Sequence, residues 1–222
     1  MRKLLLISTF LFLVNSSFGQ STKGWLIYFG QSNFKNSKFN LHHELQIRDH
    51  QVIGDHQQTL GRIAGQYKWK PYFQVSLGYA YGYSEAEGEP NLPFSEHRVY
   101  QEGLFFHKVS KLGLRHRIRV EERFVEGQEF QSRFRYCLFL DIPLTNKELN
   151  KGGVYLAFYD ELFLNIDNPM TESLFDRNRA YAGLGFKAKD QLGLQLGYMM
   201  QHVGKSKLGN HLLLSIHQQI NW

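Results

Sequence analysis

The chain ends on GNHLLLSIHQQINW, residues 209–222, and this stretch decides the fold. Read in steps of two, it separates into two faces. One face carries Leu212, Leu214, Ile216, Gln218, Ile220 and Trp222, and the other carries His211, Leu213, Ser215, His217, Gln219 and Asn221. A mostly apolar face that alternates with a mostly polar face at period two predicts an extended strand. We therefore expect the chain to end in a β-strand that stops on an aromatic residue.

This terminal segment resembles the closing strand of bacterial outer-membrane β-barrels. In that class the last strand carries alternating apolar residues and a terminal aromatic. The resemblance implies that Ile220 and Trp222 form the signal read by the barrel assembly machinery. It also implies that the lipid bilayer is the principal partner.

The N-terminal residues predict export. Arg2 and Lys3 precede an apolar run over residues 4–14, and Ser17-Phe18-Gly19 places small residues at a cleavage site. We expect a signal peptide over residues 1–19, cleaved after Gly19, and one barrel domain over residues 20–222. The alternative, an N-terminal membrane anchor, is disfavoured because a spanning helix needs about 20 apolar residues.

The composition favours strands. The 222 residues include 18 Phe, 12 Tyr and 20 Gly but only 5 Pro, and Cys137 is the single cysteine, which excludes an intrachain disulfide. No later run is apolar enough for a membrane-spanning helix. The formal charge of +6 falls to +4 when Arg2 and Lys3 are removed. Because the remaining basic residues alternate with apolar ones inside strands, we expect no nucleic-acid partner.

Extended segments of about ten residues, separated by turns, follow one another as in a transmembrane barrel. We expect them at 24–31, 38–48, 59–69, 72–83, 96–107, 111–124, 130–141, 153–164, 177–188, 191–201 and 209–222. A closed antiparallel barrel whose two chain termini lie on the same side needs an even number of strands. We therefore expect ten or twelve strands and prefer twelve, with a short strand hidden near residues 20–58. Tight turns alternate with longer loops, and residues 142–152 form an unusually long connection on the short-turn side. The predicted fold is all-β, a single antiparallel transmembrane barrel in the outer membrane.

Period two alone does not say which face lies inside. A soluble periplasmic barrel would bury the apolar face, and a membrane barrel would bury the polar one. Residues 73–83 favour the second arrangement, because one face carries Phe73, Tyr79, Tyr81 and Tyr83 while the other is small and polar. Trp69 and Trp222 lie next to strand ends, where interfacial aromatics are expected.

The polar faces predict a network of charges in the lumen. Its members are Glu44, Arg98, Glu102, Arg115, Arg117, Arg119, Glu121, Arg123, Arg133, Arg135, Glu161 and Arg179. Buried charges persist only when they are paired, so we expect ion pairs that fill a narrow barrel. The alternative is an anion-selective constriction, since rings of arginine select for anions.

A lipid-modifying hydrolase is a third possibility. His211, Ser215 and His217 share the inward face of the last strand, and His42 shares a face with Glu44. No nucleophile motif accompanies them, and polar wall residues explain the same pattern. The adjacent His42 and His43 point to opposite faces, and the acidic residues 85–89 lack the spacing of a calcium loop, so we expect no metal or cofactor.

Three motifs resemble one family. They are LRHRIRVEERF at 114–124, YDELFLNI at 159–166 and FDRNRAYAGLGFK at 175–187. The family is a domain of unknown function of Bacteroidota-type outer-membrane β-barrel proteins, and it implies no catalytic residues. Here Arg115 and the Glu121-Glu122 pair depart from its pattern. We expect an outer-membrane barrel with a structural or passive role and an arginine-rich, largely plugged lumen.

Overall fold

A computed structural model of the protein describes residues 22–145, 149–167, 173–204 and 207–222. The predicted signal peptide, residues 1–19, lies outside the described residues. Eleven strands make up the fold: β1 Thr22–Asn33, β2 Phe39–Asp49, β3 His56–Lys70, β4 Phe73–Ser84, β5 Phe94–Val109, β6 Leu112–Val125, β7 Gln131–Pro143, β8 Val154–Asn165, β9 Phe175–Lys189, β10 Leu192–Val203 and β11 Lys207–Asn221. Within those residues, no helix is long and apolar enough to cross a membrane.

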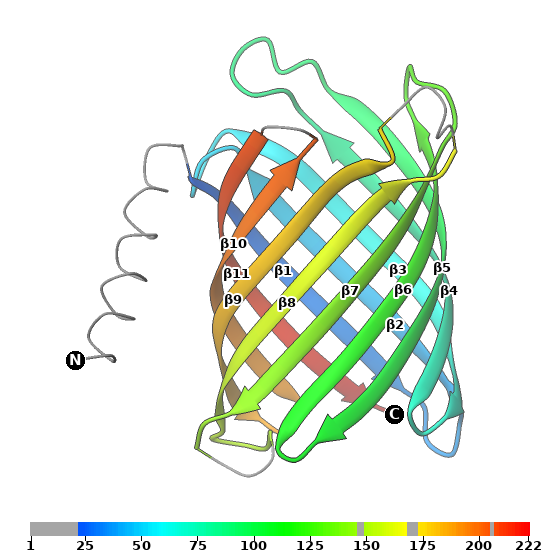
Figure 1. Cartoon of the computed structure of the whole chain (residues 1–222), viewed down its shortest axis with the longest axis vertical. Coiled ribbons are helices and arrows are strands. Elements are labelled where there is room, and N and C mark those ends of the chain that lie inside the picture. Colours follow the sequence, from blue (N-terminus) through cyan, green and yellow to red (C-terminus); the bar gives the residue numbers. More distant parts are fainter. Residues whose placement is uncertain (1–21, 146–148, 168–172, 205–206) are drawn as a thin grey trace, which may run out of the picture.

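The strands form one closed barrel in which each strand pairs with its neighbours in sequence (Figure 1). All of these neighbouring pairs are antiparallel, and β1 and β11 close the sheet in parallel. Their register runs from Thr22 opposite Asn210 to Asn33 opposite Asn221. The all-β closed barrel is thus confirmed.

The preference for twelve strands is wrong, and so is the expectation of a purely antiparallel sheet. Only residues 34–38 and 50–55 separate β1, β2 and β3, so this region holds no further strand. An even count is needed only if the two edge strands run in opposite directions. A parallel ladder also satisfies the backbone groups of both edges. As a result, β1 begins at one rim and β11 ends at the other.

The two rims carry different connections (Figure 1). The lower rim has the two-residue turns at 71–72, 110–111 and 190–191, and the upper rim has the longer loop at 85–93. The long connection between β7 and β8 also lies at the lower rim. Its Gly152 N–H donates to Lys187 O at 2.8 Å, and Leu149 packs against the buried apolar cluster inside the barrel. This connection therefore folds onto the wall and mouth of the barrel.

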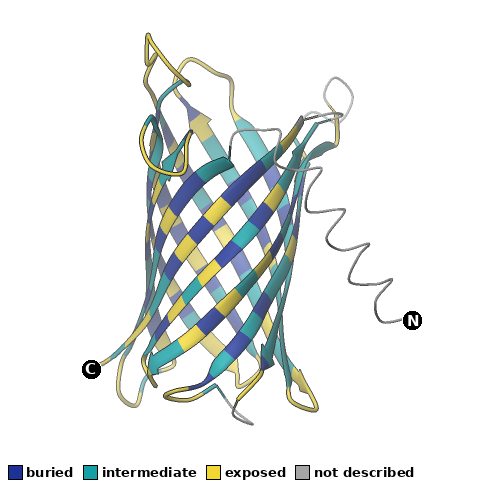
Figure 2. Cartoon of the chain, turned by 90° about the vertical axis from the view of Figure 1, so that its left-hand side faces the viewer, coloured by how far each residue is buried: buried dark blue, intermediate teal, exposed yellow. Residues whose placement is uncertain are grey.

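Burial alternates along much of the barrel wall, and most of the buried polar side chains in the middle of the strands are charged or amide groups (Figure 2). Leu77, Leu184 and Leu196 are more than half exposed on the outer face. Arg119 and Glu121 lie on the inner face with 2% and 0% exposure. The protein therefore has the inverse of a soluble barrel, with apolar side chains outside and charges inside.

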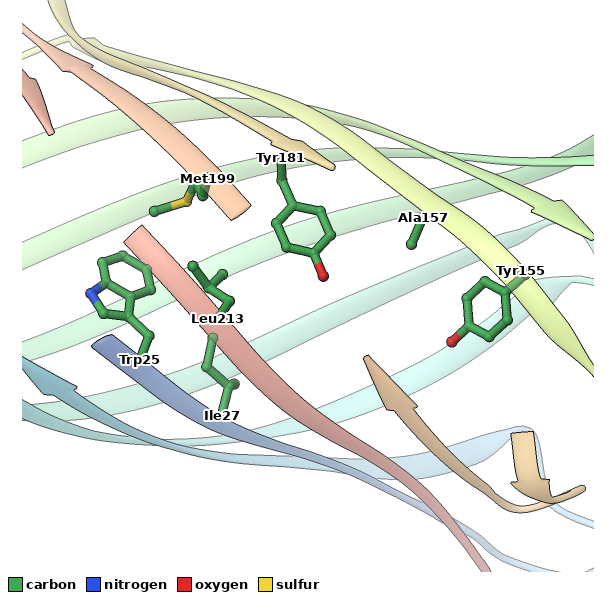
Figure 3. Close-up of a cluster of buried hydrophobic side chains, with 7 residues drawn as sticks. All are labelled: Trp25, Ile27, Tyr155, Ala157, Tyr181, Met199 and Leu213. Atoms are coloured by element: carbon green, nitrogen blue, oxygen red, sulfur yellow. The ribbon is translucent and has the colours of Figure 1, made fainter. Parts of the chain in front are cut away.

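Part of the inner wall is apolar. Trp25, Ile27, Tyr155, Ala157, Tyr181, Met199 and Leu213 form a buried cluster on β1 and β8–β11 (Figure 3). The ring of Tyr181 lies flat over Gly183 and Gly197, where a Cβ atom would collide with it. The glycines thus let aromatic rings lie along the wall of the lumen.

Candidate functional site

Glu121 is fully buried in the lumen, and its carboxylate accepts hydrogen bonds from three arginines. Arg133 Nη2 is 2.7 Å from its Oε2, Arg119 Nη1 is 3.3 Å from its Oε1, and Arg135 Nη1 also donates to Oε1. The alternation of 117–123 along β6 and of 133–135 along β7 turns these side chains to one face. The carboxylate is fully buried, so neighbouring guanidinium groups rather than solvent balance its charge.

Glu161 and Glu102 extend the network on either side. Glu161 Oε1 accepts from Arg117 Nη2 at 2.5 Å and from Arg135 Nε and Nη2 at 2.9 and 2.6 Å. Glu102 Oε2 accepts from Arg119 Nε and Nη2 at 2.8 and 2.5 Å. Arg119 and Arg135 each bridge two carboxylates, which joins β5, β6, β7 and β8 through their side chains.

Two further groups lie nearer the edges of this network. Glu96 accepts from Arg98 Nη2 at 2.6 Å and from Arg123 Nε at 2.5 Å. Glu44 accepts from Arg62 Nη1 at 2.6 Å. Each of these carboxylates thus accepts from at least one guanidinium group. The planar arrangement of the arginine N–H donors favours such pairing with a carboxylate.

The remaining ion pairs are at the two ends of the lumen. Near the lower rim, Arg115 Nη2 is 3.4 Å from Asp141 Oδ2, and the Arg115 side chain is 40% exposed. Nearer the upper rim, Asp176 Oδ2 accepts from Arg133 Nη1 at 3.1 Å and from Arg177 Nε at 3.0 Å. The network therefore extends along much of the barrel's length.

Aromatic rings fill space between the arginines. The guanidinium carbons of Arg135 and Arg179 lie 4.5 and 4.8 Å from the centre of the Phe163 ring, and Arg119 lies 4.3 Å from that of Tyr100. Both rings are 1% exposed. Stacking and ion pairing together hold the guanidinium groups in place in the lumen.

Arginines outnumber carboxylates in the described lumen. The eleven arginines are Arg48, Arg62, Arg98, Arg115, Arg117, Arg119, Arg123, Arg133, Arg135, Arg177 and Arg179. The seven carboxylates are Glu44, Glu96, Glu102, Glu121, Asp141, Glu161 and Asp176. The lumen thus carries an excess of positive charge.

The structure brings all twelve charged residues expected from the sequence to the inner face of the barrel. Sequence reasoning did not include Arg48, Arg62, Glu96, Asp141, Asp176 and Arg177 in this network. Glu96 has the same parity as Arg98, and Arg62 lies between the buried Leu60 and Ala64, so alternation could have found both. Asp176 could not be found in this way, because a bulge in the β8–β9 pairing changes the parity there.

The serine and histidines of β11 line the lumen. Ser215 Oγ lies 2.9 Å from His217 Nε2, and the His217 ring stacks on Phe29 at 4.9 Å. No carboxylate of the described residues hydrogen-bonds to His217. His211 packs edge-on against Trp25 instead. The arrangement contains a Ser–His pair without the orienting carboxylate that a triad requires.

His42 and His43 lie on opposite faces. His42 Nε2 is 3.4 Å from Glu44 Oε2 inside the lumen, whereas the His43 ring covers Gly30 on the outer face. Among the residues that the structure describes, no group of three His, Cys, Asp or Glu is arranged to hold a metal ion. Cys137 faces the lumen with 1% exposure.

The other expected positions lie near the ends of strands. Trp69 is exposed one residue before the end of β3, and Trp222 is exposed just after β11. Ile220 is on the outer face of β11, opposite Ser32 of β1. In the acidic loop, Glu87 Oε2 is 3.7 Å from Lys23 Nζ and 3.8 Å from His50 Nδ1, which ties this loop to the upper rim.

Comparison with known families gives one match. A family model described as "Protein of unknown function (DUF2490)" matches residues 22–210. No curated protein matches the chain. The matched region runs from the start of β1 into β11, so it covers nearly the whole barrel.

Proposed function

The chain belongs to the DUF2490 family of proteins of unknown function, and on that premise we propose that it is an outer-membrane barrel with a closed lumen and a structural role. The barrel adds a rigid, non-conducting cylinder to the membrane. Lipid surrounds it, and the barrel assembly machinery inserts it by way of Ile220 and Trp222.

The observation that carries the closed lumen is the burial of Glu121 at 0% exposure among Arg119, Arg133 and Arg135. A carboxylate in an open water channel would keep part of its surface hydrated. Here the side chain is fully enclosed by protein atoms, and three guanidinium groups contact its carboxylate. Since breaking a buried pair costs about 3–5 kcal/mol, the network resists opening.

The membrane location is supported by the outer face of the barrel. Leucine, isoleucine and aromatic side chains are exposed along the strands, for example Leu77 at 62% and Ile118 at 51%. Exposed apolar area on this scale is unfavourable in water and favourable against acyl chains. The short turns and the C-terminal end of β11 share the lower rim, as in barrels whose short turns face the periplasm.

A planar lipid bilayer tests the closed lumen. We expect the purified protein to insert and to give no stable conductance steps. A variant with Arg119→Ala and Arg135→Ala, which removes both bridging guanidinium groups, is expected to conduct. Ile118→Val changes only the outer face and should remain silent.

The excess of guanidinium groups supports one second candidate, a narrow channel that prefers anions. Steady, anion-selective steps from the unmodified protein would support this candidate and contradict the closed barrel. Silent insertion, verified by recovery of the protein from the bilayer, would exclude it.

A further inference from the structure

Near the upper rim of the lumen, three side chains from β2, β9 and β11 gather around the Trp25 ring of β1, and none of the four is a carboxylate. We propose that Arg48, Arg179, Trp25 and His211 form a binding site for a small oxyanion, a phosphate or carboxylate group. This inference goes beyond the structural role, because a closed barrel needs no such site.

Arg48 differs from every other arginine of the described lumen. Its Nε donates to Gln46 Oε1 at 2.9 Å and its Nη1 to Gln58 Oε1 at 2.8 Å, so its hydrogen-bond partners are neutral amides. No carboxylate of the described residues lies within 4.0 Å of it, whereas each of the other ten arginines has one. A buried guanidinium without an anion is unfavourable, and a bound anion would remove this imbalance.

Arg179 adds a second weakly balanced cation. Its Nε donates to Gln201 at 2.7 Å, and its closest carboxylate oxygen, on Glu161, is 4.0 Å away. The guanidinium carbons of Arg48 and Arg179 lie 3.9 and 5.0 Å from the centre of the same indole ring, that of Trp25. Two like charges are thus held at one aromatic ring, an arrangement that an anion between them would stabilise.

Two buried polar atoms at this place have no partner. They are Nε1 of Trp25, a residue with 6% exposure, and Nδ1 of His211, a residue with 2% exposure. Their rings are in contact, with centroids 4.9 Å apart. An indole N–H is only a donor, so its natural partner is an oxygen acceptor. Since buried polar groups in native proteins are nearly always satisfied, the unpaired indole N–H points independently to a ligand.

The chemistry of the donors sets the class of ligand. Guanidinium forks bind the paired oxygens of phosphate and carboxylate groups, and the Trp25 indole adds one N–H donor. A monatomic anion has no paired oxygens to match the forks. Lys23 precedes Trp25 by two residues on the same face of β1, nearer the upper rim, and its Nζ is 3.7 Å from Glu87 Oε2. We therefore expect a small oxyanion to enter from the upper mouth.

Isothermal titration of the full-length protein in detergent micelles tests this site with inorganic phosphate, acetate and chloride at equal ionic strength. We expect saturable binding of phosphate or acetate with one site per chain, and none of chloride. Arg48→Gln and Arg179→Gln should each weaken binding by about tenfold or more, because a hydrogen bond to a charged group is lost. Arg115→Gln, a lumen arginine at the opposite rim, is the matched control and should leave binding within twofold. Comparison of the phosphate and acetate arms identifies the preferred oxyanion.

Trp25→Phe keeps an aromatic ring but removes the N–H, and it should weaken binding by a smaller, measurable factor. If heat-modifiable migration on gels shows that Arg48→Gln does not fold, the affinity of Trp25→Phe tests the oxyanion site in its place. The proposal is overturned if the unmodified protein binds neither oxyanion, if chloride binds equally well, or if Arg115→Gln loses as much affinity as Arg48→Gln. None of these outcomes depends on whether the barrel conducts, so a failure here is separate from a failure of the structural role.

Discussion

Ile118 and Arg119 are adjacent in β6 but lie on opposite faces of the barrel, with exposures of 51% and 2%. Arg119 is enclosed by Glu102, Glu121 and the ring of Tyr100. Ile118 projects from the outer wall between Gly103 and Tyr136 of the neighbouring strands. In water, the opposite arrangement would be favoured, with isoleucine buried and arginine exposed. The exposures of these two residues therefore support the proposed membrane location.

Glu121→Gln is expected to destabilise the barrel strongly. The substitution removes the charge that balances Arg119, Arg133 and Arg135 while leaving those guanidinium groups buried. We expect the free energy of unfolding to fall by about 3–5 kcal/mol, measured by urea titration of the refolded barrel. The neighbouring Glu122→Gln, on the opposite face of β6, is the control and should change it by less than about 0.5 kcal/mol. Equal effects of the two substitutions would contradict the ion-paired lumen.

Gly197→Ala should destabilise the barrel through overpacking. The new Cβ atom would meet the ring and hydroxyl of Tyr181, which lie directly over this glycine. We expect a loss of about 1–3 kcal/mol in the free energy of unfolding. Gly61→Ala, at a glycine with no atom within 4 Å of its Cβ position, should cause no such loss. If Tyr181→Leu does not rescue Gly197→Ala, the ring is not the cause.

The parallel closure is open to a crosslinking test. Leu26 lies opposite Leu214, and Ser32 lies opposite Ile220, at the same offset along both strands. In a Cys137→Ser background, cysteine pairs at 26/214 and at 32/220 should both form disulfides under mild oxidation, because neighbouring strands hold paired Cα atoms within disulfide reach.

A pair at 26/220 is the control, since six residues along a strand span about 20 Å and forbid a bond. Gel mobility with and without reductant reports the result. An antiparallel closure would allow at most one of the two matched pairs, so a bond at only one of them would contradict the observed topology.

Trp222→Ala should impair insertion in cells more than stability. The side chain is 70% exposed, while the backbone N–H of Trp222 donates to Asn33 O at 3.0 Å and would still do so in the variant. We expect the amount of heat-modifiable barrel in the cell envelope to drop several-fold, with refolding in detergent unchanged. Trp69→Ala removes another exposed tryptophan near a strand end and is the control. Similar yields for all three proteins would show that Trp222 is not an assembly signal.

Where charged residues alternate with apolar residues, the sequence predicts which face of a strand lines the lumen. In residues 114–121, Arg115, Arg117, Arg119 and Glu121 occupy one parity, and leucine, histidine, isoleucine and valine occupy the other, so a single register is possible. In β1 both parities are apolar: Trp25 and Ile27 face inward, whereas Leu26 faces outward. Alternation therefore did not predict that Trp25 lies in the lumen, and the proposed oxyanion site around it was not found from the sequence.

The closure of the barrel was also beyond the sequence. The segments expected from alternation correspond to the eleven strands observed, yet the parity rule led us to prefer twelve. The rule failed because hydrogen bonding between β1 and β11 depends on backbone groups, which carry no sequence signal for parallel or antiparallel pairing. The lack of a carboxylate beside Arg48 in the described lumen illustrates the same limit, since it depends on which strands meet at the seam.

Quenching of tryptophan fluorescence by brominated lipids tests the inverted barrel most directly. One protein would retain only Trp25, with Trp69→Phe and Trp222→Phe, and a second would carry Ile118→Trp and Trp25→Phe in that background. After reconstitution into vesicles brominated near the middle of the acyl chains, we predict strong quenching of the tryptophan at position 118 and little quenching of Trp25. Strong quenching of Trp25, or emission from position 118 that responds to an aqueous quencher and not to bromine, would contradict the proposal that the apolar face meets lipid and the charged face lines the lumen.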